Sequence, residues 1–238
     1  CSSSGTNLIA NSTTSNVTTN GTLGDFGSGI FIGGGIVNTN IYYNSVSISG
    51  TLTGGGQPNF ALAIGGNDPA LSIRNNVLSA GSVTGSATTT GLGEYAIGFG
   101  YSIFNSLVSN YNNFFTSGAE AKFAKTGSLL PGSGTDIANL AALRTATGDE
   151  AMSISADPLF NSLSNLKPQP GSPLVGTGDP VGAIVNDIDC VIRSATDPSI
   201  GAYENSIDAA VPVITFSTLS GTCLTSNRII TATITDVS

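Results

Sequence analysis

The sequence predicts an all-β fold, a parallel β-helix in which the chain winds through stacked coils of short strands. Three observations lead to this prediction. Charged residues make up only 9% of the chain, against about 25% in ordinary globular proteins. Glycine accounts for 31 of the 238 residues, and two short motifs recur in a fixed order. The length suits one domain, or one domain with part of another.

The repeat consists of two motifs at a nearly constant distance. An apolar-x-apolar-Gly step occurs at residues 30–33, 62–65 and 97–100. An asparagine motif follows each time, at residues 43–46, 74–77 and 111–114. The separation from glycine to asparagine is 11, 10 and 12 residues, counted from 33 to 44, 65 to 75 and 100 to 112. Helical repeats would need helix-forming residues, but β-branched residues, Gly and Asn dominate here, so we expect strands.

Within each unit, apolar residues alternate with other residues. Phe60, Leu62 and Ile64 show this spacing, which is typical of strands with one buried face. Gly and Asn tolerate the left-handed backbone of sharp corners. Equivalent corners of stacked coils lie about 4.8 Å apart, so their side-chain amides can form a hydrogen-bonded ladder. We therefore expect five structural corner asparagines: Asn44, Asn75, Asn76, Asn112 and Asn113.

The predicted β-helix covers residues 1–205. Coils of about 22 to 25 residues, with variable loops between them, would give roughly six to eight coils and a rod on the order of 30 to 40 Å long. The alternative is a sandwich of unrelated short strands with turns every 8 to 12 residues or so. The fixed order of the two motifs favours the β-helix, because a sandwich has no reason to repeat the same corner residues.

One short helical excursion interrupts the pattern within residues 116–150. Thr135 or Asp136 is the expected N-cap, apolar residues follow at helical spacing over 137–144, and Gly148 is the expected end. We expect this helix to cover an apolar side of the coils or a loop.

A second domain is predicted to begin after a linker at residues 206–210. Two apolar stretches, 211–216 and 228–235, have the pattern of the first two strands of an immunoglobulin-like sandwich. Such a domain needs about 100 residues. We therefore expect residues 211–238 to be a truncated domain and the chain to be a piece of a longer protein.

Three stretches near the end of the predicted β-helix carry a family resemblance. They are ADPLF at 156–160, LKPQPGSPLVGTG at 166–178 and DIDCVIRSATDPSIGAYE at 187–204. With the upstream repeats, they resemble the secreted right-handed parallel β-helix proteins of Bacteroidota-type bacteria, many of which are exported by the type IX system. The family pattern most often has Gly where this chain has Cys190. The resemblance implies a right-handed coil and an extracellular or bacterial cell-surface location.

Charge and hydropathy exclude several classes of partner. The net charge is −8, and the seven cations are scattered, so no basic surface for nucleic acid is expected. No apolar run approaches the roughly 18 residues of a membrane span. Histidine is absent, which removes imidazole catalysis and histidine-bound metals.

The densest charged cluster lies at the end of the predicted β-helix. It consists of Asp187, Asp189, Arg193, Asp197 and Glu204. We expect an ion-paired terminal turn in which Arg193 neutralises carboxylates. The alternative is a Ca²⁺ site built from the same oxygens. No other cofactor is expected.

Cysteines and tyrosines supply the remaining candidate residues. Cys190 and Cys223 flank the predicted domain boundary, and we expect a disulfide between them. Cys1 is either a lipidated N-terminus or a fragment boundary. Tyr42 and Tyr101 are candidates for stacking on glycans, the alternative being burial in the core.

The function predicted from these features is that of a noncatalytic structural or adhesin module. Its expected partners are glycans or cell-surface components, or other subunits or domains of the same surface assembly. One alternative is a carbohydrate-active enzyme of the polysaccharide lyase or glycosidase type, which needs paired carboxylates, or Ca²⁺ with a Lys or Arg base. The coils show few such residues. The other alternative is a glycan-binding module.

Overall fold

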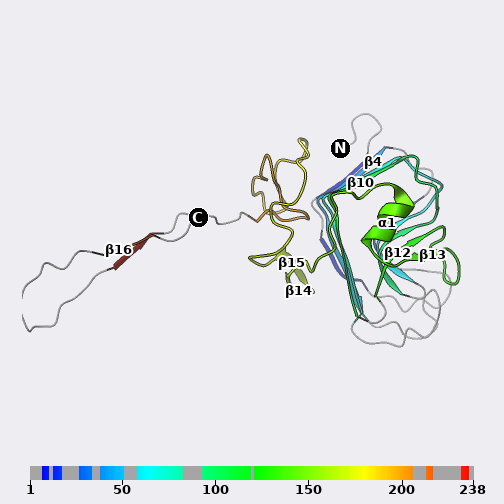
Figure 1. Ribbon diagram of the computed structural model, residues 1–238, viewed down its shortest axis with the longest axis horizontal. Helices are drawn as coiled ribbons and strands as arrows, with labels where there is room; N and C mark the ends of the chain where they lie inside the picture. Colours follow the sequence, from blue (N-terminus) through cyan, green and yellow to red (C-terminus); the bar gives the residue numbers. More distant parts are fainter. Residues whose placement is uncertain are drawn as a thin grey trace, which may run out of the picture. The chain divides into compact units, whose positions relative to one another are not determined.

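The computed structural model describes residues 7–10, 13–17, 27–33, 38–50, 58–82, 93–118, 121–205, 213–216 and 232–235. The chain divides into two compact units, Cys1–Asn205 and Ser206–Ser238. The described part of the first unit is dominated by three parallel sheets (Figure 1). The predicted all-β class is therefore confirmed.

We name the three sheets A, B and C, in the order in which the chain enters them. Sheet A contains β1 (Asn7–Ala10), β4 (Thr39–Tyr42), β7 (Leu71–Arg74) and β10 (Leu107–Asn110). Sheet B contains β2 (Thr13–Val17), β5 (Ser45–Gly50), β8 (Val77–Ser82) and β11 (Asn113–Ser117). Sheet C contains β3 (Ser28–Ile32), β6 (Asn59–Ile64), β9 (Glu94–Phe99) and β12 (Ala121–Thr126). A further strand, β13 (Thr135–Ile137), pairs with β12 in the antiparallel direction.

The order of strands is the same in all three sheets. Each strand from β1 to β9 pairs in parallel with the strand three positions further along the chain. The described chain thus passes through sheets A, B and C in turn, four times. Equivalent positions are 32 and 36 residues apart, as at Asn44, Asn76 and Asn112. A whole pass is longer than the expected coil of about 22 to 25 residues because residues 51–58 and 83–93 connect sheets B and C, in line with the variable loops expected between coils. The described strands β1 to β12 make four passes, fewer than the six to eight coils predicted.

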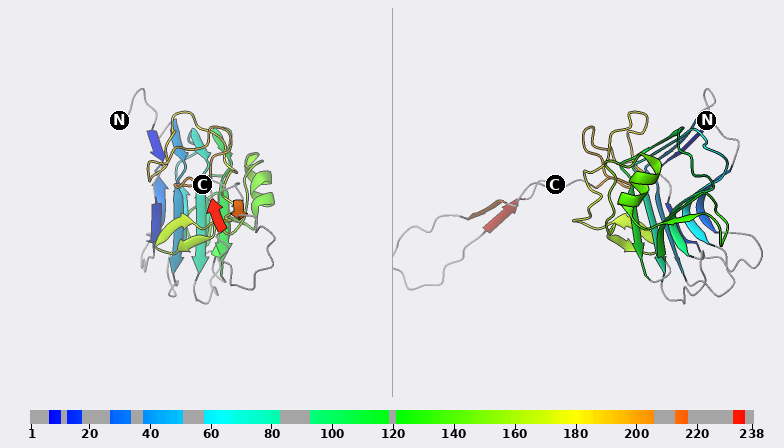
Figure 2. Two further views of the ribbon diagram at one scale, coloured as in Figure 1. Left: turned by 90° about the vertical axis from the view of Figure 1, so that its left-hand side faces the viewer. Right: turned by 45° about the vertical axis from the view of Figure 1, so that its right-hand side comes forward.

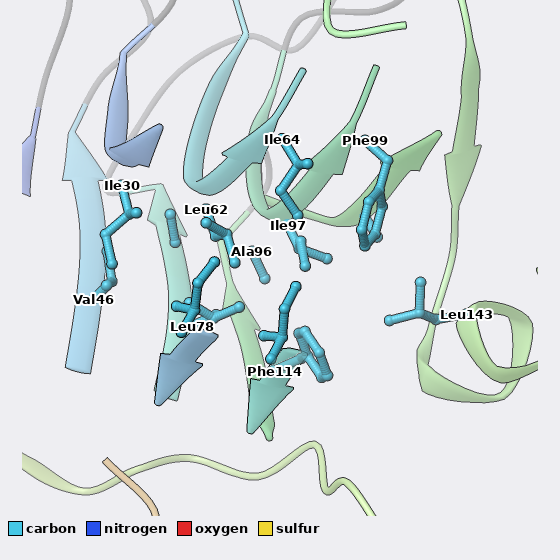
Figure 3. Packing of buried hydrophobic residues seen from close by; sticks show 14 of the residues in the cluster. Ile30, Val46, Leu62, Ile64, Leu78, Ala96, Ile97, Phe99, Phe114 and Leu143 are labelled. Atoms are coloured by element: carbon cyan, nitrogen blue, oxygen red, sulfur yellow. The ribbon is translucent and has the colours of Figure 1, made fainter. Parts of the chain in front are cut away.

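Rows of apolar side chains fill the space between the sheets (Figure 3). One row of sheet C consists of Ile30, Leu62 and Ile97. The facing row of sheet B consists of Val46, Leu78 and Phe114. Burial of each such side chain contributes about 1.5–3 kcal/mol. A slip of one residue in any strand would turn its row away from the core, so the apolar pattern also determines the register.

Strand β6 departs from strict alternation. Phe60 stacks on Tyr95 with ring centres 5.1 Å apart, and both belong to a buried cluster with Ala63 that is separate from the core. Ala63 follows the core residue Leu62 and so faces the other side of sheet C. Ala61 and Leu62 both join the core, so the alternation breaks there and Phe60 points outward. The expectation that Phe60 and Leu62 share one face is therefore wrong.

The helical excursion is α1 (Leu140–Thr147), which begins later than predicted. Its N-cap is Asn139, whose Oδ1 accepts the backbone N–H of Ala142 at 2.9 Å. The expected caps, Thr135 and Asp136, lie in β13 instead, where pairing with β12 satisfies their backbone. Gly148 ends the helix as predicted, with a left-handed φ of 80°.

Helix α1 covers the core beside the last pass of strands. Leu143 is fully buried in the core cluster, and Leu140 and Ala142 pack against it. Figure 1 shows α1 between β10 and β12. None of the helical residues that the structure describes forms a segment long and apolar enough to cross a membrane.

Residues 155–205, which we call the covering segment, pack on the outer face of sheet B. Their strands are β14 (Phe160–Ser162) and β15 (Asn165–Pro168), an antiparallel pair. Strand β15 lies beside β2 and β5, and the left view of Figure 2 shows this pair across the strands of the sheet. A small apolar cluster of Val77, Leu174 and Ile200 joins the segment to sheet B. The covering segment therefore adds a layer rather than further passes through the three sheets.

The second unit contains one antiparallel pair among its described residues, β16 (Val213–Phe216) and β17 (Ala232–Thr235). Both strands fall within the stretches predicted as strands. The predicted linker at 206–210 lies outside the described residues. The assignment of an immunoglobulin-like domain remains a prediction.

Candidate functional site

Three buried asparagines from successive passes stack at the corner between sheets A and B. The backbone N–H and Nδ2 of Asn44 donate to Oδ1 of Asn76, at 3.0 and 2.9 Å. The same two groups of Asn76 donate to Oδ1 of Asn112, at 3.0 and 3.1 Å. All three residues are fully buried. We call this set the asparagine ladder.

A residue with left-handed backbone precedes each member of the ladder. The φ angle is 54° at Tyr43, 58° at Asn75 and 56° at Tyr111. This conformation costs a non-glycine residue about 1–2 kcal/mol, so the surrounding bonds must hold it. The structure aligns Asn76 with Asn44, whereas the sequence alignment placed Asn75 there. That alignment is wrong by one residue, because two adjacent asparagines fit the motif and only the hydrogen bonds distinguish them.

The asparagine ladder ends on a buried carboxylate. Nδ2 of Asn112 donates to Oε2 of Glu150 at 3.2 Å, and the hydroxyls of Ser109 and Ser153 donate to its two oxygens. Burial raises the pKa of Glu150, and these hydrogen bonds offset only part of the effect. Arg144 of α1 donates from Nε to the Glu150 carbonyl at 2.8 Å. Glu150 therefore binds both the end of the asparagine ladder and helix α1.

The other two predicted corner asparagines bind the covering segment. Oδ1 of Asn75 accepts the N–H of Asp179 at 2.9 Å, and Nδ2 donates to the Asp179 carbonyl at 2.7 Å. Asn113 makes the same pair of bonds with Ala156, both at 3.0 Å. Each amide uses its donor and its acceptor on one backbone residue. The five asparagines thus serve two roles, stacking of the passes and attachment of the covering layer.

The predicted terminal cluster brings together three of its five charged residues. Arg193 and Glu204 form a buried ion pair with Nη1 and Oε2 3.3 Å apart. Oδ2 of Asp187 accepts the backbone N–H of Glu204 at 2.7 Å. The Arg193 guanidinium also lies 3.9 Å from the centre of the Tyr43 ring. The cluster therefore attaches the end of the covering segment to the corner that carries the asparagine ladder.

Two residues of the predicted cluster lie apart from it. Asp189 pairs with Lys167 at 2.9 Å on the surface, and Asp197 is exposed. The oxygens of Asp187 and Glu204 already accept protein donors, which favours the ion-paired turn over the Ca²⁺ site. Among the residues that the structure describes, no three His, Cys, Asp or Glu side chains are grouped to hold a metal ion.

Cys190 lies in a turn with a left-handed φ of 65°, and its N–H donates to the Asp187 carbonyl at 3.2 Å. Glycine suits this conformation. The Cys190 thiol is exposed and has no disulfide partner among the residues that the structure describes. Cys223 and Cys1 lie outside the described residues, so the disulfide between Cys190 and Cys223 remains a prediction.

The two candidate glycan tyrosines have different surroundings. Tyr101 is only 5% exposed and meets Phe99 edge-on at 5.6 Å, and burial raises its pKa. The expected glycan contact at Tyr101 is therefore wrong, because the loop after β9 turns its ring into the core. Tyr42 is half-buried on the outer face of sheet A, where its hydroxyl is hydrogen-bonded to Asn40 and Ser72 at 3.0 and 2.8 Å. A shallow groove of about 360 Å³ includes Asn40 and Ser72 in its lining.

A polar cluster on the outer face of sheet C was missed by the sequence analysis. The Tyr95 hydroxyl donates to Oδ1 of Asp136 at 2.7 Å, and Lys122 binds Oδ2 at 2.5 Å. Lys125 is almost fully buried, with Nζ 3.7 Å from Oδ1. Burial opposes ionisation of Asp136, but the bonds from Lys122 and Tyr95 lower its pKa on balance. The sequence signal was weak, because only the antiparallel pairing of β13 with β12 sets Asp136 opposite Lys125.

This cluster joins β13 to sheet C. The Asp136 carboxylate pairs with Lys122 and Lys125 and accepts the tyrosine hydroxyl, and both ammonium groups lie within 6 Å of the Tyr95 ring centre, at 5.8 and 5.6 Å. One carboxylate faces two ammonium groups, so the cluster as a whole keeps a positive charge.

Comparison with known proteins yields no match. No protein-family model matches the chain, and neither a curated protein nor a solved structure does.

Proposed function

We propose that the first unit is a right-handed parallel β-helix with three strands in each coil. The pairing of each strand with the strand three positions later, in all three sheets, supports this fold. Connections between parallel strands of one sheet are right-handed in about 98% of cases. The resemblance at residues 187–204 favours the same hand.

We further propose that the unit is a noncatalytic structural module of a secreted or cell-surface protein, part of a stalk or adhesin. The observation that carries this proposal is the continuous hydrogen bonding from pass to pass, at the asparagine ladder as well as in the three sheets. Extension along the stacking direction would have to break all the hydrogen bonds between two paired strands at once. Stiffness of this kind suits a module that holds other domains away from a surface.

The state of the carboxylates also supports a noncatalytic role. Asp136, Glu150 and Glu204 are each bound by at least two donors of the chain. Asp179 pairs with Arg74 at 3.0 Å. A lyase or glycosidase would need such groups directed at a substrate. Turnover of any polysaccharide in a panel of neutral and acidic polymers would replace our proposal by the enzyme alternative.

The proposed location is outside the cell, on the surface of a bacterium. Low charge and a surface rich in Ser, Thr and Asn suit contacts formed by many weak hydrogen bonds. The proposed partners are therefore glycans, cell-surface components or other domains of the same assembly.

Single-molecule force measurement tests the mechanical role. The full chain is pulled between handles at its two ends. We expect ruptures that release about 105 to 130 Å each, the extended length of a pass of 32 to 36 residues. Asn76→Ala should lower the rupture force of the middle passes, because it removes the central member of the asparagine ladder. Smooth extension without a rupture force would overturn the proposal.

A further inference from the structure

A cavity of about 260 Å³ lies between the outer face of sheet B and the covering segment. Its floor consists of two rows of residues in register on β5, β8 and β11. The first row is Ser47, Ser79 and Phe115, and the second is Ser49, Gly81 and Ser117. Its wall includes Asp157, Pro158 and Phe160. All of these elements belong to the first unit.

Three serines of the floor are largely buried as residues, but their hydroxyl oxygens stay accessible from the cavity and bond to no other described group of the protein. Ser47, Ser49 and Ser79 are 4%, 6% and 6% exposed. Their neighbours in sequence, Val46 and Ile48, point into the core, so the serine side chains point to the covering segment. Within the part of the chain that the structure describes, no donor or acceptor bonds to these three hydroxyls, although other buried hydroxyls such as that of Ser45 are paired.

Accessible hydroxyls that the protein itself does not bind are free to bind water or a ligand. Water is one possible partner, but 260 Å³ corresponds to roughly nine water molecules at about 30 Å³ each. The space is therefore larger than one or two structural waters require.

The lining indicates the chemistry of the occupant. Each serine hydroxyl can both donate and accept, which suits a ligand that carries hydroxyl groups of its own. Phe115 and Phe160 supply apolar surface for the C–H face of a ring. Among the lining residues that the structure describes there is no Lys or Arg, and Asp157 is the one ionisable residue. An anionic ligand is thus disfavoured, whereas the Asp157 carboxylate can accept from a neutral hydroxyl.

The wall of the cavity is held in place before any ligand binds. Asn113 binds both backbone groups of Ala156 at 3.0 Å, directly before the wall begins. The hydroxyl of Ser172 donates to the carbonyl of Pro158 at 2.8 Å. A cavity with fixed walls loses little conformational entropy when a ligand enters.

From these observations we infer that the cavity is a binding site for a neutral carbohydrate. Ser47, Ser49 and Ser79 bind the sugar hydroxyls, Asp157 accepts a further one, and Phe115 packs against the ring face. This inference rests on the glycan partners proposed above, for which it names a site and a class of sugar. It does not depend on the mechanical role, because the site lies on the outer face of a single sheet.

The test compares two size-matched double variants of the full chain. The site variant combines Ser47→Ala and Ser79→Ala. The control variant combines Tyr42→Phe and Ser72→Ala, which removes two hydroxyls from the groove on sheet A. Calorimetry and ligand-observed NMR are run with linear oligosaccharides of glucose, xylose and mannose, and with oligogalacturonate as the anionic probe.

We expect at least one neutral oligosaccharide to bind the parent chain and the control variant equally well. The site variant should bind it at least tenfold more weakly, which is a loss of about 1.4 kcal/mol. Its melting temperature should be no lower than that of the parent, because the removed hydroxyls had no partner in the protein. That result would separate a binding role from a structural one.

Three outcomes would overturn the inference. They are no binding of any neutral oligosaccharide in the panel, equal affinity of the site variant and the parent, and tighter binding of oligogalacturonate than of the neutral sugars. A loss in the control variant alone would place the carbohydrate on sheet A instead. None of these results would change the expected ruptures under force.

Discussion

The stacked passes and the covering segment are held by different kinds of interaction. In the passes, parallel backbone pairing and one repeated corner amide recur from strand to strand. The covering segment has two short strands and is attached at single points, such as Asn75 to Asp179 and the Tyr43 ring to Arg193. The backbone of the covering segment at Gly201 packs directly against the side chain of Ser45 in sheet B. A Cβ added at Gly201 would lie only 2.7 Å from Oγ of Ser45, so no larger residue fits there.

This difference teaches that one corner sequence can serve two layers. The residue at the ladder position turns inward and binds the next pass. The neighbouring asparagine, Asn75 or Asn113, turns outward and binds the covering segment. We expect the free energy of unfolding of the passes to be spread over many similar contacts. The attachment of the covering segment should instead depend on a few residues.

The largest effect is expected for Arg193→Met. This change leaves the buried carboxylate of Glu204 without its cation and removes donors from the carbonyls of Gly201 and Ala202. Breaking a buried ion pair in this way costs about 3–5 kcal/mol. Hydrogen exchange should increase across 179–205 and stay slow in β4 to β9.

Lys167→Met is the matched control for that experiment. It breaks the pair between Lys167 and Asp189, whose side chains are 44% and 48% exposed. An exposed pair contributes at most about 1 kcal/mol, so exchange should remain close to that of the parent. Uniform acceleration in all three sheets of Arg193→Met would contradict the separation of the two layers.

The next effect concerns the asparagine ladder. Asn76→Ala removes the acceptor of the buried Asn44 N–H and the Nδ2 bond to the carbonyl of Ile41, which should cost about 2–4 kcal/mol. Asn75→Gly keeps the left-handed corner and removes only the attachment of Asp179, so about 1 kcal/mol is expected. Urea unfolding followed by circular dichroism measures both. Equal losses would show that the inner and outer asparagines are not distinct in energy.

A pH effect of intermediate size is expected at Glu150. Burial raises its pKa in the folded protein above the ordinary value of 4.5, so the folded state retains the proton to higher pH than the unfolded state. Stability from this group is therefore lost as pH rises above about 4.5, by up to roughly 1.4 kcal/mol per pH unit until the folded pKa is passed. Asp149, which burial also shifts upward, acts in the same direction.

Glu150→Gln should remove most of this dependence. The amide fits the same space and keeps an acceptor for Asn112, while the hydroxyls of Ser109 and Ser153 can rotate to suit it. The stability of the variant relative to the parent should increase from pH 4.5 to pH 7 in urea titrations. Parallel pH profiles would show that Glu150 does not titrate with unfolding in this range.

The smallest effect is expected in the turn at Cys190. Cys190→Gly relieves a left-handed backbone with φ of 65° and should stabilise the unit by about 0.5–1 kcal/mol. This amounts to a rise of roughly 1–4 °C in melting temperature, measured under reducing conditions. Cys190→Ser retains the side chain and the strain, so its melting temperature should stay close to that of the parent. A gain in both variants would assign the effect to the thiol.

The repeat made much of the fold predictable. The spacing of Gly65 and Gly100 past their strands matches the structure, in which their N–H groups donate to the carbonyls of Ile32 and Ile64. The end of α1 at Gly148 was also predictable from local chemistry. The start of α1 was not, because β12 captures Thr135 and Asp136 through tertiary pairing. The outward direction of Phe60 was not predictable either. The alternation breaks at Ala61 and Leu62, and the sequence does not reveal this break because both faces of β6 carry apolar residues.

The candidate sites were predictable only in part. Five asparagines were singled out from their motif, but their division into inner and outer roles follows from which neighbours lie within hydrogen-bond distance. Asp187, Arg193 and Glu204 come together as a charged cluster, while Asp189 turns to Lys167. The serines of the cavity carried no signal, because Ser47 and Ser79 are ordinary residues of an exposed strand face until another segment covers them.

By itself, the sequence determined the strands, the corners and the parallel class of this protein, because alternation, Gly and Asn act over a few residues of chain. The tertiary structure alone decided which asparagine joins the ladder, which carboxylates are paired and where a cavity remains. Those outcomes depend on segments more than 30 residues apart meeting in space, as Asn75 does with Asp179, 104 residues away.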